Sequence, residues 1–137
     1  MKTPITFVAI TLLLVSVGCN GAKTESADHI VDHWKQAGLS STTFSSTTTE
    51  KLATDCWAGS TSGIETTLCR YSEGAAAKNA EKSGLAVVGN VTGVSLANGN
   101  WLLVIADRNK SDPNGKVINK IANVFRKIEL VAAKPSS

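Results

Sequence analysis

Residues 53–72 read ATDCWAGSTSGIETTLCRYS, and this stretch decides how the middle of the chain folds. Two runs that favour strands flank the letters STSG, which are typical of a turn. If the chain folds back at Ser62–Gly63, the numbers of facing residues add up to about 125. Cys56 and Cys69 then lie opposite one another on adjacent antiparallel strands, close enough for a bridge. The sequence therefore predicts a β-hairpin that a disulfide bond cross-links.

The same two cysteines have other conceivable uses. A redox-active pair usually has the spacing C-x-x-C, whereas 13 positions separate Cys56 from Cys69. No histidine lies near either cysteine in the sequence, so a zinc site lacks its further ligands there. A structural disulfide is the simplest interpretation in an oxidising compartment, and metal ligation and redox chemistry are the alternatives.

A helix and a second hairpin are expected after the first hairpin. Residues 72–84 predict a helix, with Ser72 as its N-cap, a run of alanines inside it and Gly84 at its end. Residues 85–108 predict a hairpin with Asn98–Gly99 as its two-residue turn and a bulge at Gly93. The run from Trp101 to Ala106 is nearly all apolar, so its strand should be central and covered on at least one face.

The final helix is indicated by an apolar stripe at helical spacing, formed by Ile118, Ile121, Ala122, Phe125 and Ile128. Asp112 can cap this helix and Pro113 suits a first helical position, although Gly115 can delay the start. Residues 131–137 should form a flexible tail.

Upstream of the first hairpin the pattern is again helical. Residues 26–38 predict a helix from Ser26 to Gly38, with one apolar face made of Ile30, Val31, Trp34 and Ala37. Residues 39–50 are rich in Ser and Thr and are either a flexible loop or an edge strand around Thr42–Thr47. We expect the strand.

The order of these elements predicts an α+β fold for a single domain over residues 26–130. We expect an antiparallel sheet of four to five strands, about three helices packed on one of its faces, and one disulfide. Cleavage of residues 1–18 would leave 119 residues, the length of one ordinary domain with a core of its own.

The N-terminal residues have the pattern of a targeting segment. Lys2 precedes Ile5–Val17, which is uncharged, mostly apolar and too short to cross a bilayer as a helix. A basic start, a short apolar run and then small residues are typical of a secretory signal peptide, here residues 1–18. A buried N-terminal helix is the alternative, but the run offers no polar face.

The end of this run, VSVGC at Val15–Cys19, resembles the lipobox of bacterial lipoproteins, although Ser16 stands where that pattern usually has Leu. The resemblance implies cleavage before Cys19, which would then carry a diacylglyceryl thioether and an N-acyl chain such as palmitate. Two or more acyl chains give stable anchoring to membrane lipid. On the same resemblance, residues 19–25 would be the lipidated N-terminus and tether, and Asn20, in place of the Asp that retains many enterobacterial lipoproteins at the inner membrane, slightly favours the outer membrane. Ordinary cleavage near Gly18 or Gly21, leaving Cys19 as a thiol, is the alternative.

The charge pattern argues against nucleic acid as a partner. The chain has 14 Lys and Arg against 11 Asp and Glu, a net charge of +3. Loss of Lys2 with the signal peptide lowers this to +2. The basic residues are dispersed, whereas a nucleic-acid binder usually clusters them.

Few residues suggest chemistry. His29 and His33 lie one helical turn apart and are candidate zinc or copper ligands, but no third ligand is near in the sequence, and an exposed polar face is the simpler reading.

Glu50, Asp55 and Glu65 flank the first hairpin and are candidate carboxylates for glycoside chemistry, or simply solvated charges. Asn90–Thr92 matches a glycosylation pattern by coincidence. No cofactor is expected.

Trp57 and Arg70 are candidate partner-binding residues. If Cys56 faces the helices, Trp57 lies on the opposite face of the sheet and meets solvent together with Leu68 and Arg70. An exposed Trp beside an Arg is a typical anchor for a partner. The alternative is that the Ser/Thr-rich segment covers this face.

The sequence therefore favours a lipid-anchored cell-envelope protein, a non-enzymatic interaction or ligand-binding module with an envelope protein as a candidate partner. The alternatives are a small envelope hydrolase whose residues assemble in space, and a periplasmic metal binder that uses His29 and His33. No G-x-S-x-G motif, phosphate loop or dinucleotide fingerprint is present in the sequence.

Overall fold

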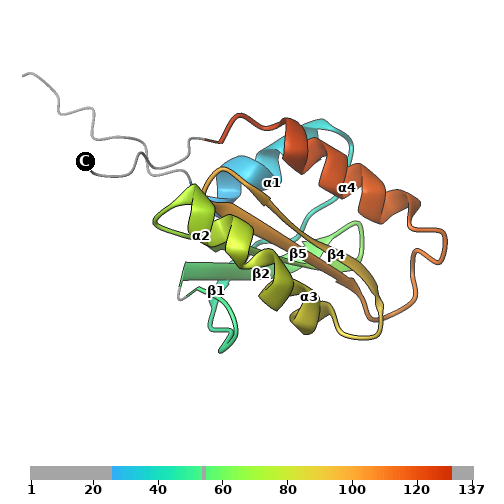
Figure 1. Ribbon diagram of the computed structural model, residues 1–137. Coiled ribbons are helices and arrows are strands. Elements are labelled where there is room, and N and C mark those ends of the chain that lie inside the picture. The colour runs from blue at the N-terminus through green and yellow to red at the C-terminus, as the bar shows by residue number, and fades with distance from the viewer. Residues whose placement is uncertain (1–25, 54, 131–137) are drawn as a thin grey trace, which may run out of the picture.

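The computed structural model describes residues 26–53 and 55–130 as one antiparallel sheet with helices around it (Figure 1). In chain order the elements are α1 (Ala27–Gln36), β1 (Ser45–Thr47), β2 (Asp55–Thr61), β3 (Ile64–Arg70), α2 (Gly74–Asn79), α3 (Glu81–Val88), β4 (Thr92–Asn98), β5 (Trp101–Asp107) and α4 (Lys116–Lys127). The five strands lie in the order β1-β2-β3-β5-β4. The predicted α+β class and antiparallel sheet are confirmed. Within the described residues, no helix has the length and apolarity needed to cross a membrane.

The helices cover both faces of the sheet, whereas one covered face was expected. Every residue of β5 is buried, so its alternating side chains need cover on both sides. Trp101, Leu103 and Ile105 join a core with α1 and α4, and Leu102 and Val104 join a second core with α3. Figure 1 shows α2 and α3 on one side of the sheet and α1 and α4 on the other.

The hairpin of β2 and β3 has the predicted register. Cys56 faces Cys69, their Cα atoms are 4.1 Å apart, and a disulfide bond joins them. Ser62 and Gly63 form the two-residue turn with φ of +50° and +80°. Positive φ at both positions is the arrangement of a type I′ turn, which suits the twist of paired strands. The predicted cross-linked hairpin is confirmed.

The helical segment after this hairpin extends further than expected. Gly84 was expected to end a helix, but it lies buried inside α3, which continues to Val88. A Cβ atom on Gly84 would meet the Ser95 hydroxyl and a methyl group of Val104. The glycine therefore lets α3 approach β4 and β5 closely, and it serves this contact instead of ending the helix.

The turn between β4 and β5 lies one residue later than expected. Asn98 pairs with Trp101, so Gly99 and Asn100 form the turn. Asn98 is instead the last strand residue, and its side-chain amide donates 2.8 Å hydrogen bonds to the carbonyls of Phe125 and Ile128 at the end of α4. The expected bulge at Gly93 is absent from this pairing, which is regular from end to end. A Cβ at Gly93 would collide with the Ile105 carbonyl.

Residues close to their ends determine where α1 ends and where α4 begins. Asp112 accepts a hydrogen bond from the Ile118 N–H at 2.9 Å and so caps α4 from within the preceding loop, while Gly115 delays the helix start. α1 ends before Gly38, whose φ is +82°. The Ser/Thr-rich segment forms the short edge strand β1 and a further bridge between Ser41 and Thr61.

Candidate functional site

Trp57 and Arg70 lie together on the face of the sheet that also carries α1 and α4. Asp55 of β2 and Trp101 of β5 flank Arg70 in the register of the sheet, so three strands contribute to the cluster. The Arg70 guanidinium carbon lies 5.5 Å from the centre of the Trp57 ring and 6.0 Å from that of Trp101. The two indole rings are 5.5 Å apart. We call Asp55, Trp57 and Arg70, with Trp101 beside them, the Trp57–Arg70 surface.

The charges on this surface are exposed to different degrees. Arg70 donates to an Asp55 carboxylate oxygen at 3.5 Å, and the two side chains are 26 % and 59 % exposed. Such a long, solvated ion pair contributes little to stability. The contact of the guanidinium with two aromatic rings is a second source of order, because a cation is attracted to the face of an indole. Arg70 is thus held in place while part of it meets solvent.

Fewer residues are exposed on this face of the sheet than the sequence predicts. Leu68, which faces Trp57 across the hairpin, is fully buried in the core beside α1 and α4, so the expectation that it meets solvent is wrong. Trp57 itself is half-buried because it sits on β2, farther from α4, with only the short strand β1 beyond it. Trp57 and Arg70 are therefore partly exposed on this face, and Asp55 beside them is exposed.

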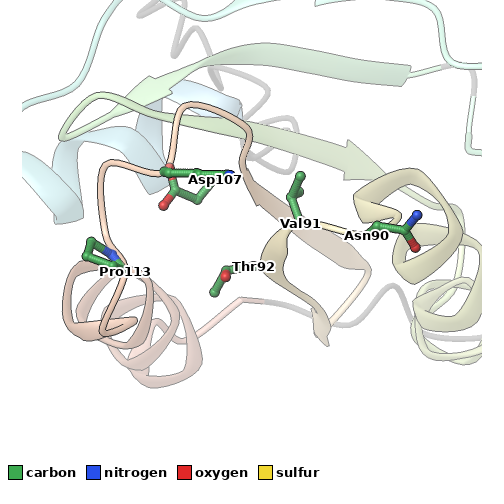
Figure 2. A pocket seen from close by; sticks show the side chains of 6 residues that line it. Asn90, Val91, Thr92, Asp107 and Pro113 are labelled. Atoms are coloured by element: carbon green, nitrogen blue, oxygen red, sulfur yellow. The ribbon is translucent and has the colours of Figure 1, made fainter.

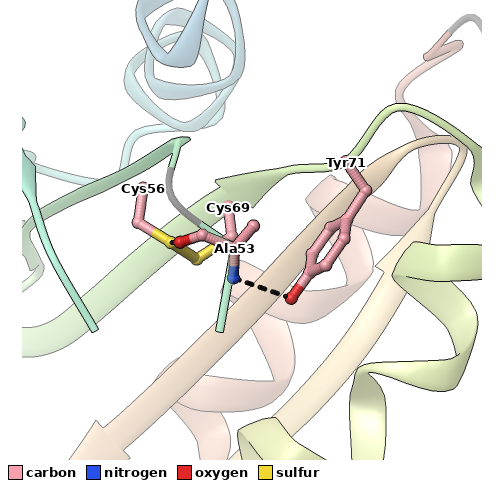
Figure 3. The surroundings of a disulfide bond; sticks show 4 residues. All are labelled: Ala53, Cys56, Cys69 and Tyr71. Atoms are coloured by element: carbon pink, nitrogen blue, oxygen red, sulfur yellow. Dashed lines mark hydrogen bonds between the residues drawn. A yellow bond between two sulfur atoms is a disulfide. The ribbon is translucent and has the colours of Figure 1, made fainter. Parts of the chain in front are cut away.

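The disulfide lies on the opposite face and is fully covered. Both Cys56 and Cys69 are buried, next to Tyr71 and the segment that contains Ala53. The Ala53 N–H donates to the Tyr71 hydroxyl at 3.2 Å, which fastens this segment over the cross-link (Figure 3). Burial raises the pKa of Tyr71, against the opposing effect of the Ala53 hydrogen bond. This environment suits a structural cross-link, because a reactive disulfide needs access for an attacking thiolate.

The two histidines meet as predicted for a helical pair. The rings of His29 and His33 are 4.9 Å apart and nearly perpendicular. Within the described ranges 26–53 and 55–130, no group of three or more His, Cys, Asp or Glu side chains is arranged to hold a metal ion. The pair is therefore a two-ligand arrangement on one helix.

The candidate carboxylates lie apart. Asp55 pairs with Arg70 at one end of the hairpin, whereas Glu65 at the other end pairs with Arg108 at 3.1 Å. Five residues of strand separate the two positions, roughly 16 Å at the usual rise. Glycosidase carboxylates lie about 5–10 Å apart, so Asp55 and Glu65 do not form such a pair. Glu50 lies in the turn before β2.

A pocket of about 280 Å³ lies at the end of the sheet opposite the Trp57–Arg70 surface. Figure 2 shows Pro113 on one side of it and Asn90 on the other, with Asp107 and Thr92 between them. The Asp107 carboxylate is buried and accepts hydrogen bonds from the backbone N–H groups of Ser111 and Asp112, at 2.9 and 2.8 Å. Both carboxylate oxygens of Asp107 thus have hydrogen-bond partners, and these bonds hold the loop before α4 in place.

Comparisons with protein-family models, with curated proteins and with solved structures each returned no match. Cys19, the candidate lipidation site, lies outside the described residues.

Sequence reasoning placed Trp57 and Arg70 together but missed two further members of the surface. Trp101 belongs to the run predicted as a covered central strand, and Asp55 was predicted as a carboxylate for glycoside chemistry or as a solvated charge. The sequence signal for Asp55 was available, because its number and that of Arg70 add up to 125. Trp101 reaches the cluster through the pairing of β3 with β5, which no local pattern indicates.

Proposed function

We propose that this chain is a lipid-anchored, non-enzymatic protein of the cell envelope that acts as an interaction or ligand-binding module through the Trp57–Arg70 surface. The observation that carries the proposal is the half-buried Trp57, held against a guanidinium that is itself partly exposed. Trp and Arg are enriched among residues that dominate binding energies, because they combine a large apolar area with polar groups. The buried neighbours of both side chains fix their positions before any contact forms.

The anchor is proposed on the N-terminal sequence. The apolar run ends at Gly18–Cys19 in the manner of a lipobox, and Asn20 favours the outer membrane as the destination. The disulfide supports export, because such bonds persist in oxidising compartments outside the cytosol. The domain would then sit on the membrane by its N-terminus and face the periplasm or the exterior.

The test is the fate of Cys19. Intact mass of the membrane form should give a chain that starts at Cys19 and carries acyl mass, and Cys19→Ser should be released to the soluble fraction or remain uncleaved. Trp57→Ala is the matched control: it should stay acylated and membrane-bound, because Trp57 contributes to contacts and not to the anchor. A mature chain that starts at Cys19 without acyl mass would contradict the proposal.

A further inference from the structure

The Trp57–Arg70 surface lies at the end of the sheet where the chain enters the domain. Arg70 ends β3 and Trp101 begins β5, so both mark this end. Figure 1 shows α1 beginning at the same end, and residues 40–42, which follow α1, bond to Ser60 and Ser62 near the opposite end. A tether that precedes α1 therefore joins the domain on the side of Trp57 and Arg70.

The length of that tether limits how far the domain can be from a membrane. On the proposed function, on which this inference rests, the lipid is attached at Cys19 and seven residues separate it from Ala27. Fully extended, these eight steps span at most about 29 Å. A domain of this size has a radius of gyration of about 13 Å, so the tether is no longer than the domain is wide. The entry end of the sheet stays within reach of the lipid headgroups.

The side chains at this end suit a lipid headgroup. An indole has an apolar body and a polar N–H, and Trp is enriched where hydrocarbon meets water. A guanidinium matches the geometry of a phosphate with two parallel hydrogen bonds. The Arg70 ion pair with Asp55 is long at 3.5 Å and solvated, so it contributes little to stability, and a lipid phosphate can bind the exposed part of the guanidinium.

We propose that the Trp57–Arg70 surface docks on the membrane that carries the anchor, with Trp57 in the headgroup region and Arg70 on a lipid phosphate. The acyl chains hold the protein at the membrane, and this surface sets which side of the domain faces the bilayer. The pocket beside Asp107 and the Ser62–Gly63 turn then point away from the lipid.

Tryptophan fluorescence tests this orientation. The acylated full-length protein is reconstituted into vesicles of phosphatidylethanolamine and phosphatidylglycerol whose acyl chains carry bromine, a quencher of indole emission. Trp34 and Trp101 are fully buried, so quenching by the lipid reports mainly on Trp57. We expect clear quenching in the parent, retention of it in Trp34→Phe, and loss of most of it in Trp57→Phe. Arg70→Gln should reduce it, because the phosphate contact is lost.

The outcomes separate this inference from the proposed function. Protein that carries acyl mass and floats with the vesicles, but shows no quenching or equal quenching in Trp57→Phe, overturns the orientation and leaves the anchor intact. Protein without acyl mass overturns both. A photo-crosslinker placed at position 57 in whole cells should attach to lipid, and a single dominant protein adduct would overturn the membrane contact in favour of a protein partner.

Discussion

Trp34 and Trp101 are both fully buried, yet their indole N–H groups have different surroundings. Trp34 donates a 3.1 Å hydrogen bond to the Ile121 carbonyl and so links α1 to α4. Trp101 Nε1 is buried and has no hydrogen-bond acceptor among the residues that the structure describes. A buried donor without a partner costs about 1–3 kcal/mol, whereas a satisfied one stabilises the fold by about 1 kcal/mol.

This difference predicts unequal effects of the same substitution. Trp34→Phe should lower the free energy of unfolding by about 1–3 kcal/mol more than Trp101→Phe does, because it removes a bond and leaves a buried carbonyl with fewer donors. Both substitutions remove the same volume from a fully buried site, so the loss of packing is similar and the N–H group makes the main difference. Urea unfolding of the two variants beside the parent measures it. An equal or larger loss in Trp101→Phe would contradict this account of its indole.

At the scale of elements, the cross-linked hairpin should contribute stability without being required for the fold. A loop of 13 residues corresponds to about 3 kcal/mol on the chain-entropy estimate. Cys56→Ala/Cys69→Ala should therefore unfold at a lower temperature and still fold, because β5 and α4 supply much of the core. Thermal unfolding and thiol counting measure this, with Cys19→Ser as a control that keeps the bridge. Two free thiols in the parent protein isolated from its own cells, or an unchanged unfolding midpoint in the double variant, would contradict the prediction.

Elements that local chemistry determines were predictable from the sequence. The turn at Ser62–Gly63 and the register of Cys56 with Cys69 follow from turn residues and an even cysteine pair, and they also placed Trp57 near Arg70. The stripe of α4 was equally readable, because its apolar residues recur at helical spacing. These features depend on residues close together in the chain.

Elements that depend on distant neighbours were not predictable in the same way. Gly84 resembles a helix end in isolation, and its role in α3 appears only beside Ser95 and Val104. Asn98 belongs to a favoured turn pair, but its amide is used by carbonyls of α4 some 27–30 residues away. The placement of helices on both faces likewise follows from the insertion of β5 between β3 and β4.

For the molecule as a whole, the two edges of the sheet are protected from pairing with another chain in different ways. β1 is a short strand of three polar residues at one edge. At the other edge, the Glu81 carboxylate accepts a 2.9 Å hydrogen bond from the outward Ala97 N–H of β4 and also pairs with Lys78 at 2.9 Å. Short length and an attached charge both discourage edge-to-edge pairing with another chain.

Glu81 should make the free energy of unfolding depend on pH in the acidic range. Burial alone would raise its pKa, but the Ala97 N–H and the Lys78 ammonium prevail and lower the pKa below the ordinary 4.5. A lowered folded-state pKa stabilises the protein above the unfolded value, and that contribution is lost as pH falls through the folded value. Glu81→Gln does not titrate, so the stability difference between parent and variant should shrink below about pH 4.5. Urea unfolding at pH 7 and pH 3 checks this, and a constant difference would contradict it.

The bridge between Cys56 and Cys69 also has a mechanical consequence. Tension applied between the two ends of the chain cannot straighten the segment it encloses, because the load passes through the sulfur atoms. The 13 residue steps between the two cysteines therefore do not extend. The fully extended length of the oxidised molecule is roughly 40 Å less than that of the reduced one. A chain held by lipid at one end and pulled at the other would keep β2 and β3 side by side even after the sheet around them had come apart.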